Sequence, residues 1–299
     1  MKKKSSPKKH SKKKGCLGLF LIVIAAFIAF ILWPMSGDDS VILSDSFDNN
    51  DNNWPLGDYE SIEKGELLLA EGDISVLPAD IQFVNGRIKG TFTYKSGDPA
   101  GNYGLIFRDI NDDIYNFFLI NSDSGFRARL QGNGEIINDK TGFITPNGSN
   151  ELIVELFGRL IRVYADGTLI AEAYDDNPTN GTFSLYSSGE SIVTVDDLEI
   201  VDFDKRPGNI TGSVLIDGDT LSGAEVIAWQ LVEPDTLGVV EIDRTTTDSE
   251  GKYRFYLPDD SSYFIEAGTP DKKFTGDRYT DLQIPDSGID LDITIKEVE

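Results

Sequence analysis

The sequence predicts an all-β protein carried by one N-terminal transmembrane helix. Two observations predict the β part: beyond Asp39 no window shows helical periodicity, and short alternating apolar and polar runs recur between clusters of Gly, Asn and Asp. A third predicts the helix, because all 18 residues from Cys16 to Trp33 are apolar or glycine. The remaining chain of about 260 residues is long enough for two domains.

The N-terminal tail is strongly basic. Eight lysines and no acidic residue precede the apolar run, whereas Ser36-Gly37-Asp38-Asp39 after it carries no positive charge. At about 1.5 Å per residue the run spans about 27 Å, close to the hydrocarbon thickness of a bilayer. Since lysines hold their flank in the cytoplasm, we expect a cytoplasmic tail over 1–14, a transmembrane helix over 15–35, a linker over 36–40 and an extracellular remainder at the cell surface.

A cleavable secretory signal is the alternative, because it has the same order of basic region and apolar core. The apolar run is longer than the core of a typical signal, and Trp33-Pro34-Met35 lacks the small residues that signal peptidase prefers. A lipoprotein anchor fits less well, since Cys16 precedes the apolar core rather than following it. Cys16 is either an apolar residue at a helix end or a palmitoylation site at the inner interface.

Charge excludes one class of partner. Without the eight tail lysines, 19 basic residues remain against 51 acidic ones, a net charge of −32. Nucleic acid requires a basic face, so it is not an expected partner. Cys16 is the one cysteine, so no disulfide can support the external part and its apolar cores must suffice.

The predicted strands of the first domain follow one another at short intervals. Asp166-Gly167 separates two of them and is typical of a two-residue hairpin turn, and Asn133-Gly134 predicts another. The predicted strands are Gln82–Tyr94, Tyr103–Arg108, Ile114–Ile120, Gly125–Gln131, Leu152–Phe157, Leu160–Ala165, Thr168–Tyr174, Thr182–Ser187 and Ile192–Phe203.

A domain boundary is predicted at Asp204-Lys205-Arg206-Pro207-Gly208, where the composition turns polar and proline appears. We therefore expect a first domain over 41–204, a linker over 205–208 and a second domain over 209–299. Seven or so short strands in the second block predict a small sandwich.

The first domain resembles the concanavalin A-like (laminin G-like) jelly rolls, including the 3-keto-disaccharide hydrolase-like family. The opening DSFDNNDNNW, the paired YGLIFRD and IYNFFLI, the hairpin FGRLIRVYADGTLIAEAYDD and the closing SIVTVDDLEIVDF carry the resemblance, in that order along the chain. It implies a jelly-roll sandwich across the whole domain.

The second domain resembles the carboxypeptidase regulatory-like, transthyretin-like modules of surface proteins. GSVLIDGDTLSGAEVIAW is similar to their opening hairpin, and TTTDSEGKYRFYLPDDSSYFIEA to their Thr-x-x-Asp-x-x-Gly-x-Tyr-x-Phe segment. The resemblance implies an Ig/transthyretin-like sandwich in which Tyr253 and Phe255 point into the core. Related pilin-type domains carry a Lys–Asn isopeptide bond, but the first and last strands here lack that pair, so we expect none.

Catalytic chemistry has few candidates. The one histidine, His10, lies in the tail, so the external part has no Ser-His-Asp triad and no histidine-containing zinc site. Carboxylate chemistry of the glycosidase type remains. The strand Glu241-Ile242-Asp243 begins like the Glu-x-Asp-x-x-Glu motif of laminarinase-type enzymes, but the third acid is absent and the segment lies in the second domain. We expect no enzyme.

A sugar-binding role predicts aromatic faces for stacking and planar polar groups for hydroxyls. The alternation of IYNFFLI puts Tyr115, Phe117 and Leu119 on one face and Asn116, Phe118 and Ile120 on the other, and only one face can be core. The competing interpretation is that the aromatic residues are core and the arginines pair with surface acids. The ligand-binding candidates are Trp54, Tyr103, Arg108, Tyr115, Asn116, Arg127 and Arg129.

Ca²⁺ is the one cofactor that the sequence suggests. Asp45 and Asp48 lie on an acidic opening loop, and Asp197 lies on the closing strand, which a jelly roll places beside the opening one. Hard cations prefer several oxygen ligands, so these carboxylates are the metal candidates. Solvated loop acids are the alternative.

Together these features predict a membrane-anchored, non-catalytic surface protein whose jelly roll binds a glycan or another surface component. The alternatives are a carboxylate-based glycoside-active enzyme and a purely structural envelope or adhesion protein.

Overall fold

The computed structural model describes residues 40–298, except 71–73, 77–80, 98–100, 111–112, 123–124, 143–147, 177, 179, 234–237 and 277–278. The predicted tail and transmembrane helix lie outside these residues. In the part of the chain that is described, no helix is long and apolar enough to cross a membrane. Its regular structure is β-strand, apart from the short 3₁₀ helix η1 (Phe203–Lys205).

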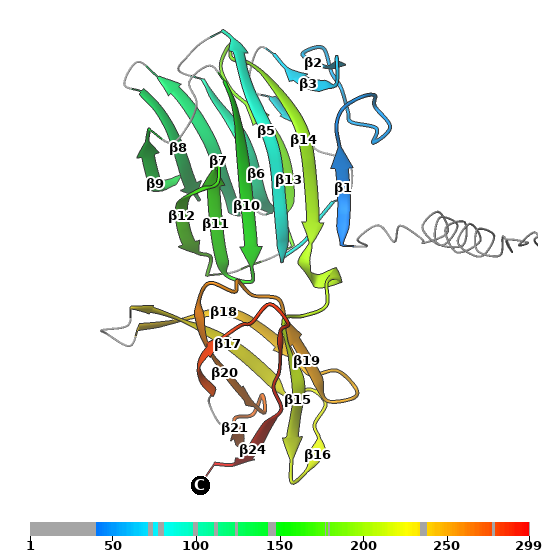
Figure 1. The fold of residues 1–299 in the computed structure, drawn as a ribbon, viewed down its shortest axis with the longest axis vertical. Coiled ribbons are helices and arrows are strands. Elements are labelled where there is room, and N and C mark those ends of the chain that lie inside the picture. Colours follow the sequence, from blue (N-terminus) through cyan, green and yellow to red (C-terminus); the bar gives the residue numbers. More distant parts are fainter. Residues whose placement is uncertain are drawn as a thin grey trace, which may run out of the picture. The chain divides into compact units, whose positions relative to one another are not determined.

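Two antiparallel sheets form the first domain (Figure 1). The eight-stranded sheet runs, in spatial order, β12 (Thr168–Tyr174), β11 (Leu160–Ala165), β10 (Ser149–Phe157), β5 (Gly86–Ser96), β14 (Ile192–Asp202), β3 (Glu66–Leu69) and β2 (Glu60–Glu63), with β1 (Val41–Asp45) also paired to β14. The six-stranded sheet runs β4 (Ile74–Val76), β13 (Thr182–Ser187), β6 (Asn102–Ile110), β7 (Asp113–Ser122), β8 (Gly125–Gly132) and β9 (Glu135–Thr141). The two-sheet sandwich that the jelly-roll resemblance implies is confirmed.

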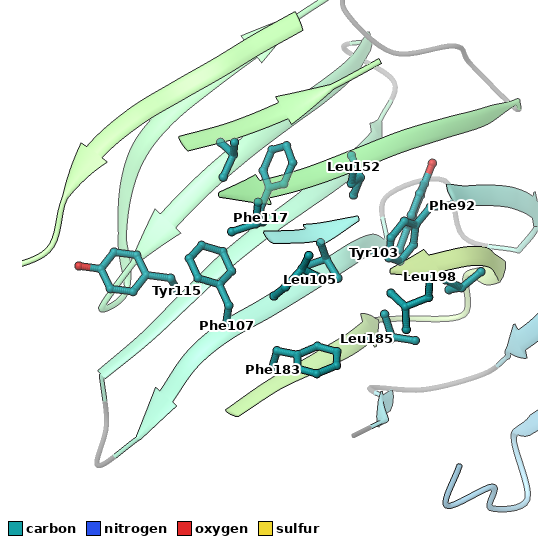
Figure 2. Close-up of a cluster of buried hydrophobic side chains, with 14 of the residues drawn as sticks. Phe92, Tyr103, Leu105, Phe107, Tyr115, Phe117, Leu152, Phe183, Leu185 and Leu198 are labelled. Carbon is teal, nitrogen blue, oxygen red and sulfur yellow. The ribbon is translucent and has the colours of Figure 1, made fainter. Parts of the chain in front are cut away.

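Alternation along the strands builds the core between these sheets. In β5, Ile88 and Phe92 are fully buried, whereas Lys89 and Thr91 between them face outward and are half-buried. Residues from both sheets meet in the buried cluster of Figure 2, where Phe92 and Leu152 lie with Phe117 and Phe183. Large interlocking apolar side chains of this kind supply most of the stability of a sandwich.

Turn chemistry fixes the registers. Asp166 and Gly167 both have positive φ, 47° and 72°, as do Asn133 and Gly134, 49° and 83°. Both pairs join consecutive strands, β11 to β12 and β8 to β9, so the two predicted hairpin turns are confirmed. The first and last strands also lie side by side, as expected, with Asp45 opposite Leu198.

Ten strands are present among the described residues of the second domain. In spatial order they are β16 (Asp219–Thr220), β15 (Ile210–Ile216), β24 (Ile293–Glu297), β21 (Phe274–Gly276), β20 (Ser262–Gly268), β17 (Glu225–Glu233) and β18 (Gly238–Thr246), with β19 (Lys252–Phe255) and β23 (Ile289–Asp290) on β15 and β22 (Tyr279–Gln283) on β20. Tyr253 and Phe255 are buried, as predicted.

The cores of the two domains are joined at their boundary. Phe157, Leu160, Val201 and Phe203 of the first domain are buried in the same apolar cluster as the core of the second. Residues 39–299 form one compact unit accordingly. The polar linker predicted over 205–208 is therefore short and lies beside an apolar contact. The two domains share part of one hydrophobic core.

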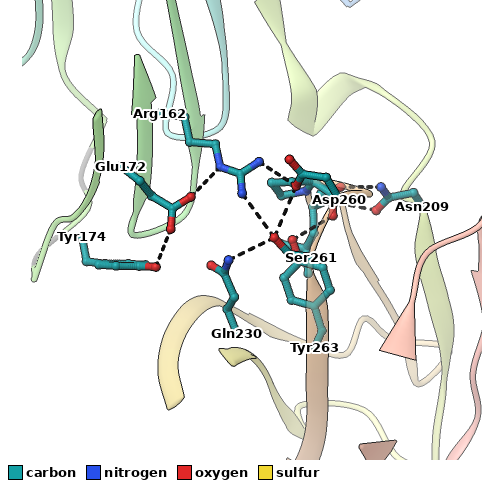
Figure 3. A network of polar contacts seen from close by, with 10 residues as sticks. Arg162, Glu172, Tyr174, Asn209, Gln230, Asp260, Ser261 and Tyr263 are labelled. Atoms are coloured by element: carbon teal, nitrogen blue, oxygen red, sulfur yellow. Dashed lines mark hydrogen bonds and ion pairs between the residues drawn. The ribbon is translucent and has the colours of Figure 1, made fainter. Parts of the chain in front are cut away.

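A polar network centred on Arg162 also links the two domains (Figure 3). The Arg162 guanidinium on β11 donates to Glu172 at 2.9 Å within its own sheet, and to Asp260 at 2.8 Å and Ser261 at 3.2 Å in the second domain. Its side chain is only 6% exposed, so these bonds operate with little water present.

A hairpin of the first domain covers a sheet edge of the second. Among the described strands β18 pairs only with β17, which leaves its other edge open. The backbone N–H of Arg159, in the turn between β10 and β11, donates to the Ile242 carbonyl on that edge at 2.6 Å. Covered edges of this kind prevent pairing with other chains.

Candidate ligand-binding face

The outer face of the six-stranded sheet is the candidate site. On β7, Tyr115, Phe117 and Leu119 point into the core, and Asn116, Phe118 and Ile120 project from the opposite face. On β8, Ala128 and Leu130 are core residues. The outward positions of that strand are therefore Arg127, Arg129 and Gln131, which are all half-buried.

The strand registers arrange these residues in rows. Phe118 lies between Gly104 of β6 and Arg129 of β8, and Gly104 in turn lies opposite Tyr186 of β13. Gly104 places no side chain between Phe118 and Tyr186 in this row, and the Phe118 ring is itself buried. The adjacent row places Asn116 opposite Gln131.

The two arginines of this face share one carboxylate. Asp139 on β9 accepts from Arg127 at 3.2 Å and from Arg129 at 2.9 Å. The three side chains are between 21% and 29% exposed, so they are accessible to a ligand. One carboxylate against two guanidinium groups leaves the cluster with a single positive charge.

No carboxylate occupies the described outward positions of β7 and β8. Those positions are Asn116, Phe118, Ile120, Arg127, Arg129 and Gln131. Hydrolysis by a carboxylate pair needs two such groups about 5–10 Å apart. Asp139 therefore has no described carboxylate partner on these two strands.

Two of the predicted stacking residues lie in the core. Tyr103 is 2% exposed and Tyr115 is 7% exposed, and Tyr115 stacks on Phe107 with ring centroids 5.8 Å apart. Burial raises the pKa of the Tyr103 hydroxyl well above its ordinary value. Stacking on a sugar requires an accessible ring, so their assignment to a ligand is corrected. The outward-facing residue of β7 at this point is Asn116, the neighbour of Tyr115.

Arg108 is also a structural residue rather than a ligand-binding one. Its side chain is 2% exposed, pairs with Asp175 at 2.8 Å and donates to the Gly158 carbonyl oxygen. Burial lowers the pKa of this guanidinium and Asp175 opposes that shift. A positive φ of 53° at Arg108, beside an irregularity in the pairing of β6 and β7, interrupts the strand alternation here.

Trp54 caps the core instead of standing exposed. It is 2% exposed, its ring lies 5.5 Å from that of Phe47, and its indole N–H donates to Asp45 at 2.6 Å. Asp45 also accepts from the Phe47 N–H at 2.7 Å and from the Asn52 amide at 2.7 Å. Asp45 thus organises the opening loop.

The predicted metal ligands are not brought together as a metal site. Asp48 is exposed and accepts from Ser46, and Asp197 is a positive-φ residue at an irregularity of β14. Burial, with Asp197, Glu66 and Asp48 contributing, raises the pKa of the neighbouring Asp196. Among the described residues no group of three or more His, Cys, Asp or Glu side chains is arranged to hold a metal ion. The described residues therefore supply no ligand set for the calcium ion that the sequence suggested.

Three of the seven ligand-binding candidates, Asn116, Arg127 and Arg129, share the outer face. Sequence reasoning missed Gln131 and Tyr186, which lie on the same face. The alternation of GFRARLQ (Gly125–Gln131) already places Gln131 on the same face as Arg127 and Arg129.

No protein-family model matches the chain, and no curated protein matches it. Solved structures similar to it include a carbohydrate-binding module CBM66 from Bacillus subtilis, 18% identical over 50% of this chain and 95% of that one, with a TM-score of 0.43. A β-1,3-1,4-glucanase from a mouse hindgut metagenome is 14% identical over 54% of this chain and 98% of that one, with a TM-score of 0.42. The laminarinase catalytic domain from Thermotoga maritima is 10% identical over 54% and 97%, with a TM-score of 0.45. Similarity this distant assigns no function.

Proposed function

We propose that the first domain binds a glycan through the outer face of its six-stranded sheet, without hydrolysing it. The observation that carries this proposal is the grouping of Asn116, Arg127, Arg129 and Gln131 around Phe118 on adjacent strands. Planar amides and guanidinium groups form paired hydrogen bonds with vicinal hydroxyls. Phe118 and Ile120 are only 6% and 8% exposed and form the packed base of this face, whereas the half-buried Tyr186 of β13 is the aromatic side chain on it that a sugar ring can reach.

The arrangement of carboxylates on this face favours binding over hydrolysis. Asp139 accepts from both Arg127 and Arg129, so its carboxylate oxygens are already engaged in ion pairs on this face. The outward positions of β7 and β8 supply no second acid. A carboxylate-based glycosidase therefore remains the weaker alternative.

Binding of residues 39–299 to immobilised polysaccharides tests the proposal. Arg129→Ala and Asn116→Ala should each weaken retention on the bound polymer about tenfold, since one good hydrogen-bonding group contributes about 1.4 kcal/mol. Arg87→Ala is the matched control, because Arg87 forms a similar half-exposed ion pair at 2.7 Å on the other sheet.

Three results would contradict the proposal. Equal weakening in Arg87→Ala would show a general effect of charge. Release of reducing ends by the wild-type protein, abolished in Asp139→Asn, would instead establish the hydrolase. Absence of any retention would favour a purely structural role.

We further propose that residues 1–35 anchor the protein in the cell membrane with the β domains outside. Support comes from the eight lysines that precede 18 apolar residues. Protease added to intact cells should then remove the β domains from the membrane fraction. Digestion only after lysis would contradict this orientation.

A further inference from the structure

A second aromatic surface lies on the second domain, away from the candidate face. In β17, Val226 and Ala228 are fully buried, whereas Glu225 and Trp229 project from the opposite side of the strand and are half-buried. Trp229 lies opposite Phe264 of β20, which is also half-buried. Two adjacent aromatic side chains thus face outward on one sheet.

A groove of about 410 Å³ runs along this side of β17. It is within the size range of small-ligand sites, and it combines apolar walls with charged groups. Its lining includes Glu225, Trp229, Arg244, Glu266, Lys272 and Phe274.

The indole N–H of Trp229 is an unusual feature of this groove. It is buried and has no hydrogen-bond partner among the described residues. Such a group costs about 1–3 kcal/mol and is rare in folded proteins. The N–H is shielded from solvent, so the part of the half-buried Trp229 side chain that a ligand can reach is the indole face.

The charged groups of the groove are fixed in orientation. Arg244 donates to Glu241 through two bonds of 3.0 and 2.8 Å and also pairs with Glu225. The Arg244 side chain is still 45% exposed and that of Glu225 31%. One guanidinium group against two carboxylates leaves this cluster with a single negative charge, and it offers paired donors and acceptors.

A peptide strand cannot extend the sheet here. β17 is paired on both sides, with β18 and β20, and β20 is paired with β17, β21 and β22. Recognition by strand addition needs a free edge. The groove must therefore use side chains, and an indole face beside oriented carboxylate and guanidinium groups suits a ring that has both C–H faces and hydroxyls.

We propose that this groove is a second saccharide-binding site, with Trp229 as the stacking platform and Arg244 and Glu225 as the hydroxyl-binding pair. It does not depend on the function of the first domain. Together the two sites would make the protein bivalent for a polymer.

Tryptophan fluorescence gives a direct test, because residues 39–299 contain only Trp54 and Trp229. Trp54→Phe leaves Trp229 as the sole emitter. Titration of this variant with cellohexaose, xylohexaose and laminarihexaose to millimolar concentration should give a saturable change in emission with at least one of them. Adding Arg244→Ala should weaken that binding at least tenfold, whereas Lys252→Ala, in an exposed ion pair on β19, should leave it unchanged.

The result that overturns the proposal is no saturable change with any of the three sugars, or a change of equal affinity in the Arg244→Ala variant. Arg129→Ala must retain the Trp229 signal; its loss would place the ligand on the first domain instead. The double variant Trp229→Ala/Arg129→Ala, once a thermal melt has shown that it folds, should show no binding of the three sugars by calorimetry.

Discussion

Arg108 illustrates how one residue departs from the pattern of its strand. It lies in a strand that alternates, yet its side chain turns inward to Asp175 and to the turn at Gly158. The buried pair joins the end of β6 to the loop after β12. Its removal therefore affects the contact between sheets and not only a surface charge.

We predict that Arg108→Ala lowers the free energy of unfolding by about 3–5 kcal/mol, because it leaves a carboxylate and a carbonyl buried without this donor. Arg127→Ala, which removes one of two guanidinium groups from a half-exposed carboxylate, should cost about 0–1 kcal/mol. Urea denaturation of residues 39–299 measures both. Equal losses would mean that burial does not distinguish the two ion pairs.

At the scale of elements, the hairpin between β10 and β11 holds the two domains together. Gly158 has a φ of 55°, and a Cβ at this position would overlap the Ile242 carbonyl oxygen of β18. Gly167, in the next hairpin, has a φ of 72° but no atom within 4 Å of such a Cβ. Substitution of the two glycines therefore distinguishes the effect of a steric clash, present only at Gly158, from the effect of positive φ, present at both.

We predict that Gly158→Ala loosens the second domain and Gly167→Ala does not. Both substitutions pay about 1–2 kcal/mol for the left-handed conformation. Gly158→Ala must in addition displace β18 from the turn, so its thermal melt should separate into two transitions. Calorimetry measures this directly, and identical melts of the two variants would contradict it.

The strand pattern was predictable where apolar residues alternate over six or more positions, as in Leu160–Ala165. It was not predictable for β2 and β9, which carry charged residues such as Glu60 and Asp139, or for β3, which has only four residues and three consecutive leucines. Which face of β7 is core was equally hidden, since both of its faces carry a phenylalanine. Pairing with β8, whose outward positions are charged, decides it.

For the whole molecule, Asp243 links stability to pH. It lines a cavity of about 230 Å³ at the domain boundary with Asp204, Arg206 and Tyr256. Burial, with Asp204 and Glu241 contributing, raises its pKa from 3.8 to about 7. A carboxyl group with a raised pKa binds more protons in the folded state, so its contribution is fully present below pH 3.8 and is lost as the pH rises through about 7.

We predict that Asp243→Asn flattens the fall in stability between pH 4 and pH 7, since the amide does not titrate. Asp248→Asn is the control, because backbone hydrogen bonds lower the pKa of that exposed carboxyl group and its effect lies at lower pH. Melting temperatures across this range give the comparison. An unchanged slope in Asp243→Asn would place the titrating group elsewhere.

The pairing of β1 with β14 also determines how the protein responds to mechanical force. Val41 at the start of β1 lies opposite Val201, just before the chain enters the second domain, and the Asp202 N–H donates to the Ser40 carbonyl at 2.8 Å. Tension between the N-terminal segment and a ligand on the second domain pulls these two ends apart in opposite directions. The strands then unzip one hydrogen bond at a time instead of shearing together, so β1 is the first element to yield. The Arg206 side chain also donates to the Ser40 hydroxyl at 3.0 Å, so this bond and the Asp202 bond are the first that such tension loads.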